Sequence, residues 1–289
     1  MSGFDAGWLR LRAPYDDAAR NPDLLARLTA WRRRRDRLGL IDLGAGTGAT
    51  LRVLAPLLGG EQRWLLVDHD PALLAAQRPE TQAWAEAKGY VLTAQENGFT
   101  VSGDTFQAEA LPFRADLSAR LDALPTEGAQ LVTASALLDL VSAAWLDRLV
   151  GLCRDRRLGC YAALSYDGRL DWSPADRLDA AMHALFDRHQ RQMKSFGPAL
   201  GPDAAALAEQ RFRTAGFTVR AGRSDWRMEA TDRDMQEALL GFYVQSAREI
   251  DPTQADAIEH WRQRRRLALG AGHSRHSVGH VDILALTES

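Results

Sequence analysis

The stretch from Asp42 to Gly48 is the part of the chain whose residue types and spacing are most specific for chemistry. It reads D-x-G-x-G-x-G and lies between an apolar run and a segment with helical spacing. Glycine lets the backbone turn sharply and lets a ligand approach where a Cβ would collide, while a following helix presents free N–H groups. The stretch also fits G-x-G-x-x-A through Gly44, Gly46 and Ala49, so the glycines alone leave a nicotinamide or flavin cofactor open.

An acidic residue, Asp68, ends the next apolar run, 24 residues after Gly44. A carboxylate at the end of the second strand of such a unit accepts hydrogen bonds from both hydroxyls of a ribose. Asp68 and the glycine loop together therefore predict a ligand-binding site rather than only a tight strand–helix turn.

Histidines and arginines form two further groups of chemically capable residues. His273, His276 and His280 resemble metal ligands in spacing, but loop and strand geometry need not bring them together and no cysteine or carboxylate completes a set. We therefore expect no metal site. The four arginines 32–35 end a predicted helix, where the helix dipole favours positive charge, and we interpret them as a solvated helix end.

The composition limits the classes of protein that these residues can serve. The chain has 289 residues, 36 basic and 38 acidic side chains and a formal charge of −2, so nucleic acid and anionic membrane partners are not expected. Its two cysteines, Cys153 and Cys160, indicate a reducing compartment. The first twenty residues carry charges where a signal peptide is apolar, and no run of about 18 apolar residues occurs. These features predict a cytoplasmic protein.

The elements that position the site alternate between strands and helices. After a helix at 23–35, strands are predicted near 38–43 and 63–70, each followed by a helix, and Asn97-Gly98 marks a hairpin within 90–117. A strand and turn at 128–141, a helix at 143–155 and a strand at 159–168 follow. The remaining predicted elements are an inserted helix and loop, a helix at 204–215, a strand at 217–226, a helical stretch at 232–266 and a last strand at 277–286. This order predicts an α/β fold with a mostly parallel sheet covered by helices on both faces.

The sequence resembles the class I S-adenosylmethionine (SAM) dependent methyltransferases, and most of all their bacterial small-molecule members. IDLGAGTGATL, WLLVDHDPALL and AQLVTASALLDLVS carry the resemblance over residues 38–168, and GFTV with HVDILAL extends it loosely to the last strands. A W-L-x-L-R segment at 8–12 is similar to the N-termini of those members. The resemblance implies a Rossmann-like doubly wound, mostly parallel seven-stranded sheet with a C-terminal antiparallel strand. It also implies one domain over 1–289, with an N-terminal helical cap at 1–36 and an inserted helical lid at 169–203.

The resemblance implies SAM as cofactor, with the glycine loop against its methionine part, Asp68 on the ribose and His69 on the adenine. After the third strand both Asp116 and Glu109 are candidates for the adenine amine, and Asp116 is preferred because a helix begins there. The implied SAM-binding residues are Asp42, Gly44, Ala45, Gly46, Gly48, Asp68, His69, Asp116, Leu117, Ser135 and Arg12.

Candidate catalytic residues lie after the fifth strand, where an acceptor is expected to sit. His189 shares an apolar helical face with Leu178, Met182 and Leu185, so it is either a core histidine or a general base, and Tyr166 is a candidate acceptor contact. Asp139 is either a ligand-facing acid or a helix N-terminal acid. Arg10, Arg12 and Arg20 are candidates for binding a carboxylate, or else occupy solvated helix positions.

The predicted function is transfer of a methyl group to O, N or C of a small-molecule acceptor. The alternatives are a non-catalytic SAM-binding or protein-interaction module, a protein methyltransferase, and a nicotinamide-dependent oxidoreductase. An RNA substrate is disfavoured because T-A-S-A follows the fourth strand in place of an N-P-P-Y motif. The sequence leaves the acceptor and the oligomeric state open.

Overall fold

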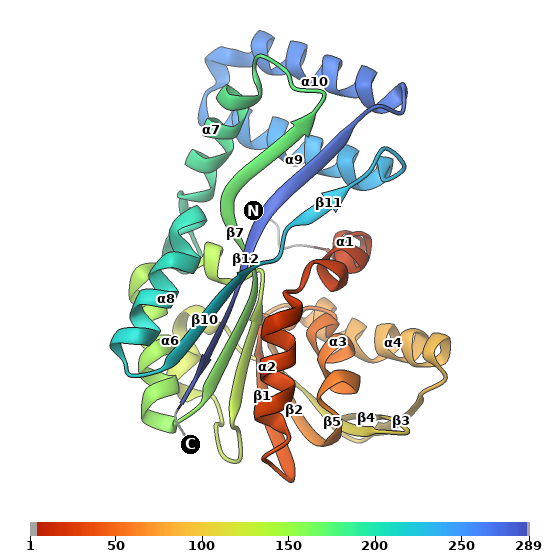
Figure 1. Cartoon of the computed structure of the whole chain (residues 1–289), viewed down its shortest axis with the longest axis vertical. Helices are drawn as coiled ribbons and strands as arrows, with labels where there is room; N and C mark the ends of the chain where they lie inside the picture. Colours follow the sequence, from red (N-terminus) through yellow and green to blue (C-terminus); the bar gives the residue numbers. More distant parts are fainter. Residues whose placement is uncertain (1–4, 288–289) are drawn as a thin grey trace.

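A computed structural model describes residues 5–287 of the chain, and its centre is one large mixed sheet (Figure 1). The strand order is β10-β12-β7-β6-β1-β2-β5-β4-β3. Strands β5, β2, β1, β6 and β7 run parallel, and β12 is antiparallel between β7 and β10. These seven strands form the predicted Rossmann-like sheet with its C-terminal antiparallel strand, so the fold prediction is confirmed.

The strands of this sheet follow the predicted runs closely. They are β1 (Arg37–Leu43), β2 (Gly60–Asp68), β3 (Val91–Gln95), β4 (Gly98–Gly103), β5 (Phe106–Arg114), β6 (Leu131–Ser135), β7 (Gly159–Ser173), β10 (Thr218–Arg223), β11 (Trp226–Met228) and β12 (Arg275–Leu286). Strands β3 and β4 form the hairpin that Asn97-Gly98 predicts, and β4 extends the sheet beyond β5. A separate small hairpin joins β8 (Met193–Lys194) to β9 (Gly197–Pro198).

Helices cover both faces of the sheet, as the strand–helix alternation predicts. They are α1 (Ala6–Ala19), α2 (Pro22–Arg32), α3 (Ala49–Leu58), α4 (Pro71–Lys88), α5 (Leu117–Arg120), α6 (Ala143–Arg156), α7 (Asp179–Gln190), α8 (Ala204–Thr214), α9 (Arg233–Ile250) and α10 (Ala255–Gly270). Apolar side chains of α6 and α8 fill the core on one face, and those of α2 and α3 fill the core on the other. None of the helices described within residues 5–287 is both long and apolar enough to cross a membrane.

Strands β7 and β12 continue past the rest of the sheet and carry an upper lobe. Pairing of β6 with β7 stops at Ser135 and Ala163, whereas β7 and β12 stay paired as far as Ser173 and Arg275. Helices α7, α9 and α10 pack on this extension with β11 and enclose a third core that contains Tyr243 and Trp261 (Figure 1). The upper lobe therefore stands directly above the carboxyl edge of the parallel strands.

Two predicted segments are each divided in the structure. The helical stretch 232–266 breaks into α9 and α10 at Pro252, because proline lacks the N–H that a continuous helix needs. The strand 217–226 separates into β10 and β11, opposite a shift in the pairing of β12 between Val278 and His280. The segment 169–203, predicted as an inserted helix and loop, begins with the last five residues of β7.

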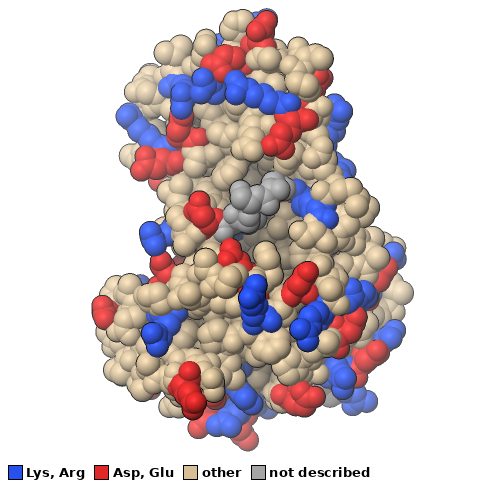
Figure 2. Space-filling model, turned by 180° about the vertical axis from the view of Figure 1, so that it is seen from behind, with Lys and Arg blue, Asp and Glu red and all other residues tan. Residues whose placement is uncertain are grey.

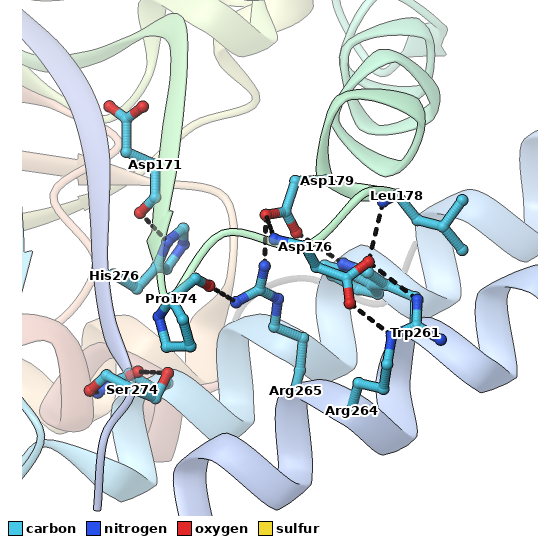
Figure 3. A network of polar contacts seen from close by, with 11 residues as sticks. Asp171, Pro174, Asp176, Leu178, Asp179, Trp261, Arg264, Arg265, Ser274 and His276 are labelled. Carbon is cyan, nitrogen blue, oxygen red and sulfur yellow. Dashed lines mark hydrogen bonds and ion pairs between the residues drawn. The ribbon is translucent and has the colours of Figure 1, made fainter.

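A buried polar network joins α10 to the segment that precedes α7 (Figure 3). Arg265, which is 2% exposed, donates to the Pro174 carbonyl and to the Asp179 carboxylate, and the indole of Trp261 donates to Asp179. Arg264 forms an ion pair with Asp176 on the adjoining surface. Removal of one partner of a buried pair leaves the other charge uncompensated, so this network should fix α7 on α10.

Candidate functional site

The glycine loop lies at the carboxyl end of β1, immediately before α3. Gly44, Gly46 and Gly48 have φ angles of +65°, +52° and +82°, in the left-handed region that favours glycine. A Cβ at Gly46 would lie 3.1 Å from Leu9 Cδ1 of α1. The loop is therefore made of glycine for its backbone conformation, and α1 packs directly against it.

Asp68, at the end of β2, holds this loop from the neighbouring strand. Its Oδ2 accepts the Gly46 N–H at 2.9 Å and its Oδ1 accepts the Asp70 N–H at 3.0 Å. The Gln77 side chain of α4 donates to the Gly46 carbonyl at 3.0 Å. His69 Nδ1 also lies 3.4 Å from Asp68 Oδ1. A carboxylate has about four acceptor positions, so Asp68 retains capacity for at least one further donor.

Asp42 places a second carboxylate at the base of the loop. Its Oδ1 accepts the Thr133 hydroxyl at 2.7 Å, while its Oδ2 is buried without a hydrogen-bond partner among residues 5–287. Burial raises the pKa of Asp42 to about 7, against the lowering effects of Thr133 and the nearby Arg20 charge. The Asp68 charge also raises the pKa of Asp42, which indicates that the two carboxyl groups lie close enough to interact.

The next part of the site follows β5. Asp116 caps α5 and accepts the Ser118 N–H at 2.9 Å, and its pKa is lowered by its hydrogen bonds with Ser118 and by the nearby His69. His69 is largely exposed, and Leu117 is buried in the core. Glu109 lies in the middle of β5, opposite Arg63 and Thr100. Of the two candidate acids, Asp116 is the one at the carboxyl edge.

Arg12 of α1 and Arg20, which caps the end of α1, have different surroundings. Arg12 is held by Asp16 through contacts of 2.8 and 3.0 Å and lies over the Trp226 ring at 4.9 Å. Arg20 is 4% exposed and donates to the Ser135 hydroxyl at 3.3 Å, but its Nε and Nη1 are buried without partners in the described part of the chain. Sequence spacing gives no signal for this difference, because it arises from the packing of α1 against β6 and β11.

The two candidate catalytic residues lie higher, in the upper lobe. The Tyr166 hydroxyl donates to Asp187 Oδ1 at 2.8 Å, and burial raises its pKa. His189 is buried, with Nε2 3.0 Å from Glu249 Oε2 of α9, and burial lowers its pKa. The structure thus brings the glycine loop, Asp42, Asp68, Asp116 and Ser135 to one edge and places His189 in the contact between α7 and α9.

The three C-terminal histidines do not converge. His276 stacks on Trp172 at 3.8 Å and hydrogen-bonds to the Tyr243 hydroxyl, whereas His280 packs between Tyr166 and Trp226. Within residues 5–287, no three His, Cys, Asp or Glu side chains form a group that could hold a metal ion.

Charged side chains are mixed over the surface. On the face drawn in Figure 2, acidic and basic side chains alternate, and a row of basic side chains across the upper part is flanked by acidic ones. Arginines 262 and 266 of α10, for example, form ion pairs with Glu259 and Glu237.

No protein-family model and no curated protein matches the chain. Among solved structures, a SAM-dependent methyltransferase from Thiobacillus denitrificans in complex with S-adenosyl-L-homocysteine is 14% identical, with a TM-score of 0.43, over 97% of this chain and 98% of that one. The cyclopropane synthase MmaA2 from Mycobacterium tuberculosis is 10% identical, with a TM-score of 0.45, over 90% and 83%. The YcgJ protein from Bacillus subtilis is 10% identical, with a TM-score of 0.46, over 93% and 100%. Such low values do not carry a reaction or a substrate over to this chain.

Proposed function

We propose that the protein binds SAM at the glycine loop and transfers its methyl group to a small-molecule acceptor. The observation that carries this proposal is the pair of carboxylates, Asp42 and Asp68, on either side of a left-handed glycine loop. When bound, SAM supplies an electrophilic methyl group on a sulfonium. A cationic sulfonium and amino group suit a site with two acids.

Of the two carboxylates, Asp42 argues against a dinucleotide, whereas Asp68 would fit the ribose of either cofactor. A pyrophosphate would bring two negative charges to the N-terminus of α3, beside the buried Asp42. Like charges at close range in a partly desolvated site are unfavourable, because little water is present to screen them. Asp42 is thus the residue that separates a SAM site from a nicotinamide site, although the glycine spacing fits both.

Other residues at this edge match the remaining parts of SAM. Asp68 has free acceptor capacity for at least one ribose hydroxyl, and the exposed His69 with Asp116 would flank the adenine. Arg20 is the better partner for the methionine carboxylate than Arg12, because Asp16 already binds Arg12 through two contacts while Arg20 Nε and Nη1 have no hydrogen-bond partner among residues 5–287. Tyr161 and Asp282 do lie near the Arg20 guanidinium. A guanidinium binds a carboxylate through two parallel hydrogen bonds.

The acceptor side of the site would lie between this edge and the upper lobe. Tyr166 and His189 remain candidate catalytic residues, and segment 169–203 remains the proposed border of the acceptor pocket. In-line methyl transfer depends on an acceptor held near contact distance, so the residues there would act by orientation, by exclusion of water and, for a protonated acceptor, by removal of a proton.

Calorimetric titration tests the proposal without knowledge of the acceptor. We expect S-adenosylhomocysteine to bind to the wild-type protein and NADPH not to bind. Arg20→Gln should weaken the binding of S-adenosylhomocysteine by about tenfold or more, as loss of hydrogen bonds to a charged group predicts. Arg10→Gln, at an exposed position of α1, should leave this affinity unchanged. Binding of NADPH in place of S-adenosylhomocysteine would refute the proposal.

A further inference from the structure

A further acid, Asp139, follows the carboxyl end of β6 and is not used by any part of the proposed SAM site. It follows β6, two residues after Leu137, whose side chain lies 3.6 Å from the Cβ position of Gly44. Asp139 is 9% exposed, and its Oδ1 is buried without a hydrogen-bond partner among the described residues. A buried polar atom with no partner carries a large desolvation cost, so it marks a position where a ligand donor is expected.

The cations near Asp139 do not satisfy this oxygen. Arg12 faces it from α1 but is held by Asp16, and Lys194 faces it from the β8–β9 hairpin. No ion pair within 4.0 Å joins Asp139 to either cation in the part of the chain described. The backbone N–H groups of Asp139 and Tyr166 also favour its charged form, against a burial effect that raises its pKa to about 6.

The β8–β9 hairpin lies over this position. The Leu200 N–H donates to the Val141 carbonyl at 2.8 Å, and a Cβ at Gly197 would lie 3.4 Å from Ser142 Cβ. These contacts keep the half-buried Lys194 near enough to Asp139 and Glu249 for both acids to raise its pKa. Asp139 therefore lies after the carboxyl end of β6, near Arg12 of α1, Lys194 of the hairpin and the Tyr166 backbone of β7.

We propose that Asp139 binds the amino group of the acceptor, and that the acceptor is therefore a small amine. The inference rests on the proposed function. An ammonium would supply both the missing donor to Oδ1 and the charge that a desolvated carboxylate needs. Before transfer it must lose one proton, to Asp139 or to water, so that the nitrogen lone pair can form the new bond to the methyl carbon as the carbon–sulfur bond breaks. A hydroxyl would supply only the donor, and a carboxylate acceptor would place two like charges together.

The test uses wild-type protein saturated with S-adenosylhomocysteine, whose binding is first established by calorimetry. NMR of ¹³Cγ-labelled aspartate then follows titration with three matched sets at pH 7.5: propylamine, propanol and propionate; benzylamine, benzyl alcohol and benzoate; and N-methylpropylamine with its ether and acid counterparts. We expect at least one amine to shift the Asp139 resonance saturably, and its alcohol or ether and acid counterparts not to do so.

Variants complete the test. Asp139→Asn should weaken the binding of the amine by about ten- to a hundredfold, as expected for a hydrogen bond to a charged group. The affinity for S-adenosylhomocysteine should stay within threefold of the wild-type value. Asp155→Asn, an exposed acid on α6, is the matched control and should change neither. Lys194→Met should strengthen the binding of the amine by about two- to fivefold, because the substitution removes a nearby positive charge.

The outcomes separate this inference from the proposed function. If S-adenosylhomocysteine does not bind, the proposed function fails first. If it binds but no amine shifts Asp139, if an alcohol binds as tightly, or if Asp139→Asn binds the amine as the wild type does, the amine subsite is wrong and the SAM site stands.

Discussion

Replacement of Asp68 with asparagine should separate the two tasks assigned to this carboxylate. In the structure its two oxygens accept separate backbone N–H groups, from Gly46 and Asp70, at 2.9 and 3.0 Å. An amide has one oxygen and one NH₂ group, so one of the two N–H groups must face a donor. A buried N–H left unpaired costs about 1 to 3 kcal/mol, which should appear as a lower Tm.

The loss of charge should affect the ligand as well. One hydrogen bond between a ribose hydroxyl and a charged acceptor contributes about 1.5 to 3 kcal/mol, which corresponds to a roughly 10- to 150-fold weaker Kd for S-adenosylhomocysteine. Calorimetry measures this affinity and thermal unfolding measures the stability. Glu61→Gln is the matched control, because Glu61 lies at the opposite end of the same strand in an exposed pair with Arg37. An affinity within threefold of wild type for Asp68→Asn would refute the ribose assignment.

Three further substitutions test other parts of the account. The pKa of Asp42 rises from near 4 in the unfolded chain to about 7 in the folded protein, so the folded state loses stability as pH rises from about 4 to 7. Asp42→Asn should therefore raise the unfolding free energy by up to about 4 kcal/mol at pH 8 and by much less at pH 5. An equal effect at both pH values would contradict this. Arg265→Met should cost about 3 kcal/mol of unfolding free energy because it leaves the Asp179 charge without its cation, whereas Arg266→Met, in an exposed pair, should cost less than about 1 kcal/mol. Similar denaturation midpoints would show that the buried network does not fix the upper lobe. His189→Ala should lower turnover by about 10² to 10⁴ with unchanged S-adenosylhomocysteine affinity if His189 moves a proton, and a lower Tm with normal turnover would limit it to its contact with Glu249.

Much of the sheet and of the glycine loop could be predicted, because the sequence patterns that indicate them span only a few consecutive residues. The glycine loop, the acid that ends β2 and the Asn97-Gly98 turn each occupy a few consecutive residues whose backbone requirements show in the sequence. Apolar runs then set the strand positions, and parallel strands need covering helices on both faces. The order of the elements therefore predicts a mostly parallel sheet, whereas the seven strands and the antiparallel last strand were implied by the resemblance to the methyltransferases.

The upper lobe could not be predicted in the same way, because its contacts join distant segments. Nothing in the periodicity of α7 indicates that His189 meets Glu249, sixty residues later, and nothing in α1 indicates that Arg12 is held by Asp16 while Arg20 keeps two unpartnered nitrogens. The burial of Asp139 likewise depends on the β8–β9 hairpin. These features follow from tertiary packing, which single-sequence patterns do not encode.

A crystal structure of the protein with S-adenosylhomocysteine tests the central claim most directly. We predict that the ribose hydroxyls bind Asp68, that the homocysteine carboxylate meets Arg20 and that the sulfur lies above the glycine loop, on the side of Asp139. A ligand bound elsewhere, or one whose ribose and carboxylate contact neither Asp68 nor Arg20, would contradict the assignment of this edge of the sheet as a methyl-donor site.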